Sequence, residues 1–133
     1  MPYPVSESLA ERIEALYGWP RADLEAHAAT TDRPTMLAAL LDAFSTVELA
    51  EKNIEFQRER LLQLAAPGRD VGRSTPGHLL DCSRRIAEAV VIRDTQAQHA
   101  TAVLQSLHRT PASASPPASP SPVPPTARAA HAR

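Results

Sequence analysis

The chain has 133 residues, and the roughly 109 that precede Thr110 are enough for one modest folded domain. Its 14 lysines and arginines against 15 acidic residues give a net charge of −1, which argues against binding to nucleic acid by overall charge. A single cysteine, Cys82, excludes a disulfide framework or a cysteine-built zinc site within one chain.

Targeting and membrane signals are missing from the sequence. No window of about 18 uncharged apolar residues occurs, and the first 16 residues carry acids where a signal peptide needs an apolar stretch. We therefore expect a cytoplasmic protein with no membrane contact. Arginine makes up all but one of the basic residues and alanine is abundant, a bias that indicates a GC-rich bacterial genome.

Two short helices are predicted at the N-terminus. The first spans residues 8–17: Ser8 and Glu11 form a capping box, and Gly18 ends the helix. Its apolar face consists of Leu9, Ile13, Leu16 and Tyr17. The second helix is expected over residues 20–29.

Two long helices follow, at residues 33–66 and 76–109. Asp32 is the expected N-cap of the third helix, with Pro34 tolerated in its first turn. Pro76 takes the first position of the fourth helix, after Thr75. No stretch alternates apolar and polar residues, so the predicted fold class is all-α.

A short loop rich in glycine and proline joins the long helices, which predicts a long antiparallel hairpin with coiled-coil packing. With the two short helices added, the predicted architecture is similar to a three- or four-helix bundle. The expected contact positions of the third helix are Leu37, Leu40, Phe44, Val47, Glu51, Ile54, Arg58 and Leu61. Those of the fourth helix are Leu79, Cys82, Ile86, Ala89, Arg93, Gln96, Ala100, Val103 and Leu107.

Charged residues at these contact positions need partners. Folding the chain about residues 70–71 places Arg93 near Glu48 and Glu51, so we predict an ion pair with one of them, which would fix the register of the helices. The alternative is that Arg93 extends its charge to solvent along its apolar stem. We also expect Tyr17 and Trp19 to pack on the Phe44 end of the hairpin.

Residues 110–133 are predicted to be a disordered tail rich in proline, serine and alanine. They contain seven prolines, no acidic residue and almost no large apolar side chain, so they cannot bury enough surface to offset the entropy of ordering. Pro117-x-x-Pro120 and Pro122-x-x-Pro125 fit a polyproline II ligand. A passive solubilising tail is the other interpretation.

Catalytic, cofactor and metal sites are not indicated. No two histidines stand four residues apart, no Glu-x-x-His pair occurs, and no nucleophile motif is present. The loop between residues 67 and 75 lacks the spacing and the lysine of a phosphate-binding loop. The first two helices do not match a helix-turn-helix. We therefore expect a protein that is not an enzyme, with no cofactor, no metal and no small-molecule substrate.

Apolar side chains outside the helix–helix contact are the most informative anomaly. Leu49 and Phe56 lie opposite the Leu37–Phe44 face, and Val91 and Ile92 fall at a similar height on the fourth helix. Either the first helix covers these four residues or a second chain does, as in a dimeric four-helix bundle. They are the candidate protein interface of a non-enzymatic protein that contacts a protein partner or self-associates as a homodimer.

A second candidate surface is a basic patch around the tip of the hairpin. Its members are Arg58, Arg60, Arg69, Arg73, Arg84 and Arg85, against three acidic residues between positions 56 and 85. Such a patch could touch nucleic acid, which gives the alternative function of a bacterial nucleic-acid-associated or regulatory accessory protein. A solvated surface with local ion pairs is the simpler interpretation.

Overall fold

The computed structural model describes residues 3–113, with the backbone alone for residues 109–113. This part of the chain folds into four helices without a strand, which confirms the all-α prediction. The helices are α1 (Pro4–Tyr17), α2 (Arg21–Ala29), α3 (Met36–Leu64) and α4 (Thr75–Ser113). The last 20 residues of the predicted tail, 114–133, lie outside the described residues.

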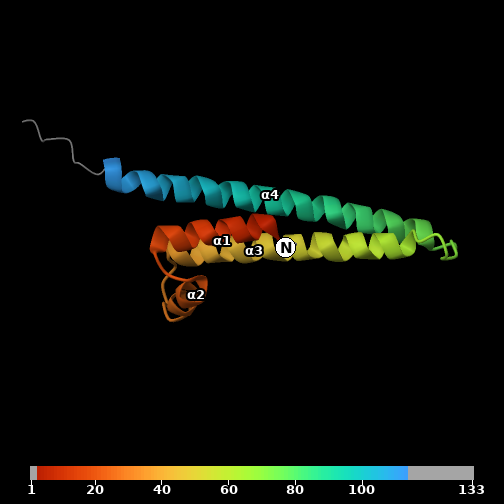
Figure 1. Cartoon of the computed structure of the whole chain (residues 1–133), viewed down its shortest axis with the longest axis horizontal. Coiled ribbons are helices and arrows are strands. Elements are labelled where there is room, and N and C mark those ends of the chain that lie inside the picture. Colours follow the sequence, from red (N-terminus) through yellow and green to blue (C-terminus); the bar gives the residue numbers. More distant parts are fainter. Residues whose placement is uncertain (1–2, 114–133) are drawn as a thin grey trace, which may run out of the picture.

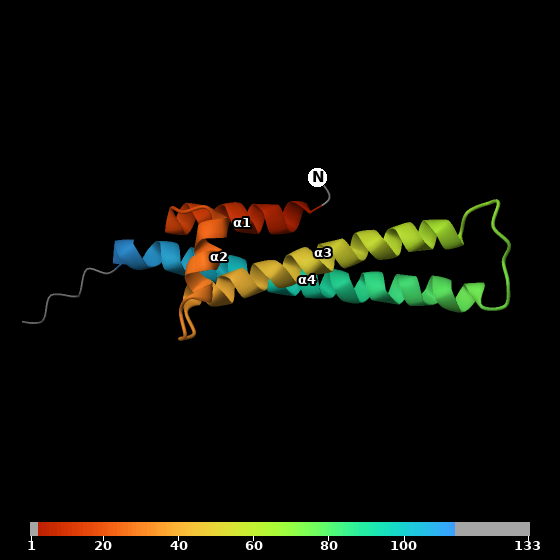
Figure 2. The same ribbon diagram turned by 90° about the horizontal axis from the view of Figure 1, so that it is seen from below.

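Helices α3 and α4 form the predicted long antiparallel hairpin (Figures 1 and 2). Helix α1 lies along the part of the hairpin where α3 begins and α4 ends, and it contacts both helices. Helix α2 packs across the start of α3. The molecule is therefore a three-helix bundle at one end and a two-helix hairpin at the other. We call residues 52–92, which extend past the N-terminal end of α1, the outer hairpin.

The N-terminal end of α1 differs from the prediction. The helix begins at Pro4 rather than near Ser8, which lies exposed inside the helix, so the proposed capping box is wrong. Proline at the first position is pre-set for a helix because its fixed φ is helical and its missing N–H has no intrahelical acceptor there. The C-terminal end is as predicted, with Gly18 in the left-handed conformation at φ 74° and its N–H bonded to the carbonyl of Glu14.

Helix α3 begins at Met36, and its N-cap is Thr35 rather than Asp32. The Thr35 hydroxyl accepts a hydrogen bond of 3.0 Å from the N–H of Ala38. Pro34 stays outside the helix because the N-cap, Thr35, follows it and has an extended backbone (φ −122°, ψ 159°). Helix α3 ends at Leu64, two residues earlier than expected, and α4 continues to Ser113, four residues further.

Buried apolar side chains are concentrated in the three-helix end. They form one cluster in which Phe44 and Val47 of α3 meet Ile13 of α1 and Leu104 of α4. The full cluster is Leu9, Ala10, Ile13, Leu24, Leu37, Leu40, Leu41, Phe44, Val47, Ala100 and Leu104. In the outer hairpin the buried apolar residues are Leu64, Cys82 and Ala89, which gives a thinner core.

The predicted contact positions hold for all of α4 and for most of α3. Each of the nine positions on α4 is buried or partly buried. On α3 the prediction fails at Arg58, which is exposed, while its neighbour Gln57 is only 5% exposed. The amide of Gln57 hydrogen-bonds the side chain of Asn53, and an uncharged side chain is less costly to bury there than a guanidinium.

The N-terminus of α1 is fastened to α3 by two carboxylates one turn apart. Glu51, only 5% exposed, accepts hydrogen bonds from the backbone N–H groups of Val5 (3.1 Å) and Ser6 (2.7 Å). Glu55 accepts one of 2.7 Å from the hydroxyl of Tyr3. This bond raises the pKa of the Tyr3 phenol, because ionisation would place a phenolate against a carboxylate.

The predicted ion pair of Arg93 with Glu48 or Glu51 is wrong. Arg93 pairs with its neighbour Asp94 at 2.9 Å, and Glu48 pairs with Lys52 at 2.9 Å. Arg93 does border the same hollow as Glu51, as the folding register predicts. The carboxylate is satisfied instead by backbone N–H groups at the start of a helix, where the positive end of the helix dipole also favours a negative charge.

Replacing Glu51 tests whether its hydrogen bonds to Val5 and Ser6 hold α1 against α3. Glu51→Ala leaves two N–H groups without their acceptor, and we expect the free energy of unfolding to fall by about 2 kcal/mol. Chemical denaturation followed by circular dichroism measures the change. Glu59→Ala, at an exposed site on the same helix, is the control and should change stability by less than about 0.5 kcal/mol. Equal effects of the two variants would contradict an anchoring role for Glu51.

The hydrogen bond between Tyr3 and Glu55 predicts that stability depends on pH. Because the folded-state pKa of Tyr3 is raised above its ordinary value of 10.0, its contribution to stability is complete below pH 10 and is lost as the pH rises through the raised pKa. The stability difference between the native chain and Tyr3→Phe should therefore shrink above pH 10. A difference that stays constant across this range would contradict the contact with Glu55.

Candidate interaction surfaces

The predicted protein interface lies on the surface, and α1 does not cover it. Leu49 and Phe56 of α3 are 68% and 58% exposed, and Val91 and Ile92 of α4 are 64% and 47% exposed. Helix α1 packs instead against Phe44 and the neighbouring core residues. The first of the two alternatives predicted from the sequence, that α1 covers these four residues, is therefore excluded. We refer to these four residues as the apolar band.

A groove runs between α3 and α4 beside this band. It has a volume of about 540 Å³, with Leu49 and Ile92 on its walls and the small, buried side chains of Ala50 and Ala89 among its lining. Lys52, Arg85 and Glu88 also line it. A second open hollow, of about 520 Å³, is lined by Val91 and shares Glu88 and Ile92 with the groove.

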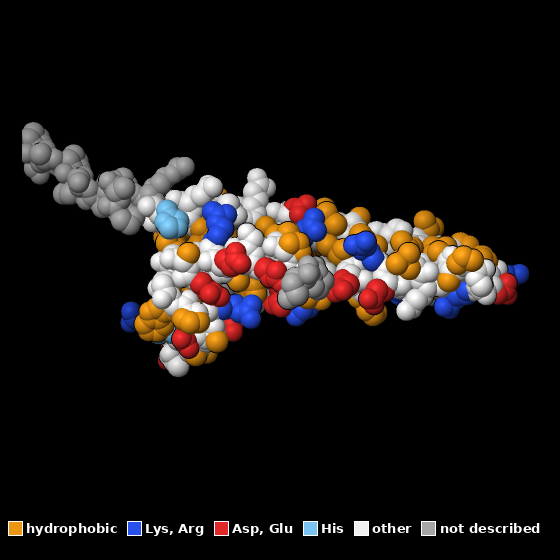
Figure 3. Space-filling view, in the orientation of Figure 1, with side chains coloured by type: hydrophobic (Ala, Val, Ile, Leu, Met, Phe, Trp, Pro, Cys, Tyr) orange, Lys and Arg blue, Asp and Glu red, His pale blue; other side chains and the backbone are white. Residues whose placement is uncertain are grey.

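Further apolar side chains reach the surface of the outer hairpin. Leu62, Val71 and Leu80 are between 69% and 73% exposed. Figure 3 shows hydrophobic side chains on the surface along this end of the molecule and again around α2. With only two helices in cross-section, the outer hairpin has too little interior for every large apolar side chain.

The six arginines of the basic patch do not converge on one surface. Arg84 bonds Asp81 and Glu88, each at 2.8 Å, and Arg85 bonds Asp81 at 2.9 Å. The two arginines lower the pKa of the Asp81 carboxyl by donating hydrogen bonds to it. These local ion pairs neutralise much of the charge on the α4 side of the patch.

The remaining arginines are spread out. Arg58 borders the hollow that contains Glu51, Glu55 and Arg93, which shares no residue with the groove bordered by Arg85. Arg60, Arg69 and Arg73 are exposed and make no ion pair with another described residue. The patch is thus a set of separate charges around the hairpin tip.

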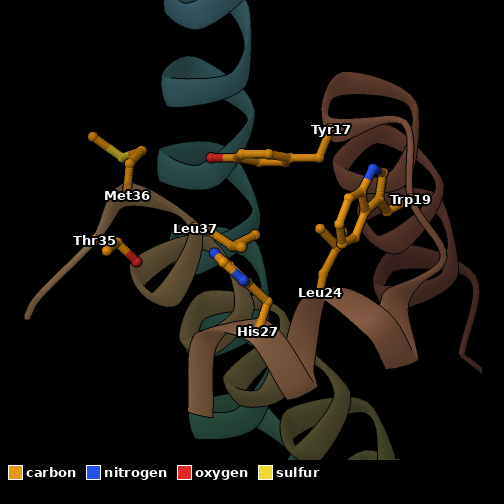
Figure 4. A pocket seen from close by; sticks show the side chains of 7 residues that line it. All are labelled: Tyr17, Trp19, Leu24, His27, Thr35, Met36 and Leu37. Carbon is orange, nitrogen blue, oxygen red and sulfur yellow. The ribbon is translucent and has the colours of Figure 1, made fainter. Parts of the chain in front are cut away.

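A pocket that sequence reasoning missed lies at the three-helix end (Figure 4). It has a volume of about 440 Å³ and is lined mostly by apolar and aromatic groups from the end of α1, from α2 and from the start of α3. The lining residues are Tyr17, Trp19, Leu24, His27, Thr35, Met36 and Leu37. The Trp19 and His27 rings meet edge to face, with centroids 6.5 Å apart.

The exposure of Trp19 corrects the expectation that it packs into the core. Its side chain is 56% exposed, whereas Tyr17 is partly buried against the core cluster, where desolvation raises its pKa. The left-handed Gly18 and the extended Pro20 turn the chain between α1 and α2, so Trp19 ends up on the outside of that turn. An aromatic residue between a glycine and a proline was the available sequence signal.

No chemical centre emerges from the described residues. Cys82 is 1% exposed, which makes it a small buried apolar group rather than an accessible thiol. Within residues 3–113 no group of three histidine, cysteine or acidic side chains is placed to hold a metal ion. None of the helices in this range is long and apolar enough to cross a membrane.

Comparison of the chain with protein-family models, with curated proteins and with solved structures finds no match. We therefore infer function from the surfaces of the molecule alone.

Trp19, in the turn after α1, gives a testable contrast with Leu24, a buried residue of the same pocket. Leu24 is 3% exposed, so Leu24→Ala should lower the free energy of unfolding by about 3 kcal/mol. Trp19→Ala, at a half-exposed side chain, should cost about 1 kcal/mol or less. Thermal and chemical denaturation compare the two variants. A larger loss for Trp19→Ala would mean that the indole belongs to the core.

Proposed function

We propose that the protein is a non-enzymatic helical module that acts through protein–protein contacts and self-associates through the apolar band. The observation that carries this proposal is the position of the band. Its four large apolar side chains are 47% to 68% exposed, and two of them, Leu49 and Ile92, line a groove in the surface of a hairpin whose own helices do not cover them.

The shape of this region suits a second copy of the chain. A dimer with twofold symmetry needs a surface that is complementary to itself. Leu49 and Phe56 provide projecting side chains, and the groove beside them, with Ala50 and Ala89 in its lining, has room to accept such side chains from the other copy. Fully burying each large apolar side chain contributes about 1.5–3 kcal/mol.

The charges around the groove are also compatible with self-association. Lys52 and Arg85 are positive and Glu88 is negative, so the rim carries both signs rather than a field of one sign. A twofold axis can set positive groups of one copy opposite negative groups of the other, whereas a rim of one sign would repel itself.

Nucleic-acid binding by the arginine patch is the weaker proposal. Arg84 and Arg85 already pair with Asp81 and Glu88, and Arg58 borders a different hollow from Arg85. Phosphate binding requires several cations along one path, because affinity grows with the number of phosphates neutralised.

Phe56→Glu tests the dimer directly. The carboxylate would be buried without a partner in the interface, so we expect the dissociation constant to rise at least tenfold while the helical content stays unchanged. Sedimentation velocity gives the mass, and circular dichroism gives the helicity.

Leu62→Glu is the matched control. Leu62 lies on the same helix and is 70% exposed, but it stands six residues beyond Phe56, about 120° round the helix and outside the apolar band, so its substitution should leave the dissociation constant unchanged. A native chain that sediments as a monomer at high concentration would contradict self-association. Retention on DNA that weakens steeply with salt would favour the arginine patch instead.

A further inference from the structure

The aromatic pocket of the three-helix end has the features of a site for proline-rich peptide. Figure 4 shows the side chains of Tyr17, Trp19 and His27 around the same hollow, with Leu24 and Leu37 beside them. Proline-rich segments in the polyproline II conformation dock on grooves lined by aromatic rings, because the flat rings match the proline faces and little entropy is lost.

Polar groups at the pocket meet a second requirement of such a ligand, which is a source of hydrogen-bond donors. A polyproline II helix makes no internal hydrogen bonds, so its carbonyl groups need external donors. The indole N–H of Trp19 and the imidazole of His27 line the pocket, and neither hydrogen-bonds another described residue. Trp19 is therefore placed to contact a proline and to donate to a neighbouring carbonyl.

The chain itself carries a matching sequence directly after α4. Residues 114–133 contain six prolines, including Pro117-x-x-Pro120 and Pro122-x-x-Pro125, and they follow directly on α4. Leu107 of α4 packs against the cluster that contains Leu24 and Leu37 of the pocket. The helix continues for six residues beyond Leu107, about 9 Å, before Ser113 ends it.

Length and charge are both sufficient for docking within one molecule. The three residue steps from Ser113 to Pro116 can span about 10 Å, similar to the length by which α4 continues past Leu107. Residues 116–125 in the polyproline II conformation span about 30 Å, enough to extend back along the bundle to the pocket. Residues 114–133 include Arg128 and Arg133 and no acidic residue. Residues 20–35, which border the pocket, carry three acidic residues (Asp23, Glu25 and Asp32) against two arginines (Arg21 and Arg33), so their net charge does not oppose a basic segment.

We propose that the Trp19 pocket binds the proline-rich C-terminal segment of the same chain, residues 116–125, as a polyproline II ligand. The pocket is then a proline-rich peptide site with a tethered ligand, and another peptide of this kind must displace the tethered segment to enter. This interaction is independent of the apolar band, which lies on residues 49–56 and 91–92.

The fluorescence of Trp19 reports on this contact because it is the only tryptophan in the chain. The test compares the full-length native chain with a full-length variant carrying Pro117→Ser, Pro120→Ser, Pro122→Ser and Pro125→Ser. A seated ligand covers most of a pocket's surface, so the acrylamide quenching constant of Trp19 should be about threefold lower in the native chain. The protection should be independent of protein concentration, as an intramolecular contact requires.

Two further full-length variants make the result specific. Ser115→Ala with Ser119→Ala and Ser121→Ala changes the same segment while keeping every proline, and it should be quenched like the native chain. Met36→Asp places a charge at the exposed edge of the pocket and should be quenched like the proline variant. Circular dichroism checks that all variants retain the same helicity.

Equal quenching constants in the native chain and the proline variant would overturn the proposal. So would protection that disappears on dilution, since the ligand would then be the segment of a second copy. Both results are separable from the dimer test, because Phe56→Glu leaves the pocket and the proline-rich segment intact.

Discussion

The contact on which the arrangement of helices depends is the one between the Glu51 carboxylate and the first N–H groups of α1. A buried carboxylate is costly unless its lone pairs are satisfied, and the first N–H groups of a helix have no acceptor of their own. The Glu51 carboxylate therefore accepts hydrogen bonds from the N–H groups of Val5 and Ser6, and both sides of the contact are satisfied. Because Glu51 lies partway along α3, this contact also fixes where α1 begins against the hairpin.

The position of that contact divides the molecule into two unequal parts. Between Glu51 and the start of α3, three helices surround a core that contains Phe44 and Val47. Beyond Glu51 only two helices remain, and small residues such as Cys82 and Ala89 fill their contact. Large apolar side chains in the outer hairpin have no third layer to pack against, which is why Phe56 and Val91 stay on the surface.

The two proposed binding surfaces follow from this division and differ in character. The apolar band beside the Ala50–Ala89 groove is an extended surface on rigid helices, suited to another helical surface. The Trp19 pocket is concave, lies where three elements meet, and combines aromatic faces with the donors of Trp19 and His27. We propose both as sites of recognition.

The sequence by itself determined the four helices, the end of α1 at Gly18 and the contact positions along α4. It also identified the four residues of the apolar band. These features follow from helix period and turn chemistry, which are encoded within a few residues. The tertiary structure decided the partner of Glu51, the burial of Gln57 in place of Arg58 and the exposure of Trp19. The clearest case is Glu51, because its carboxylate and the N–H of Ser6 are 45 residues apart in the chain. Local patterns show that a charge needs a partner, and only the docking of α1 shows which partner is within reach.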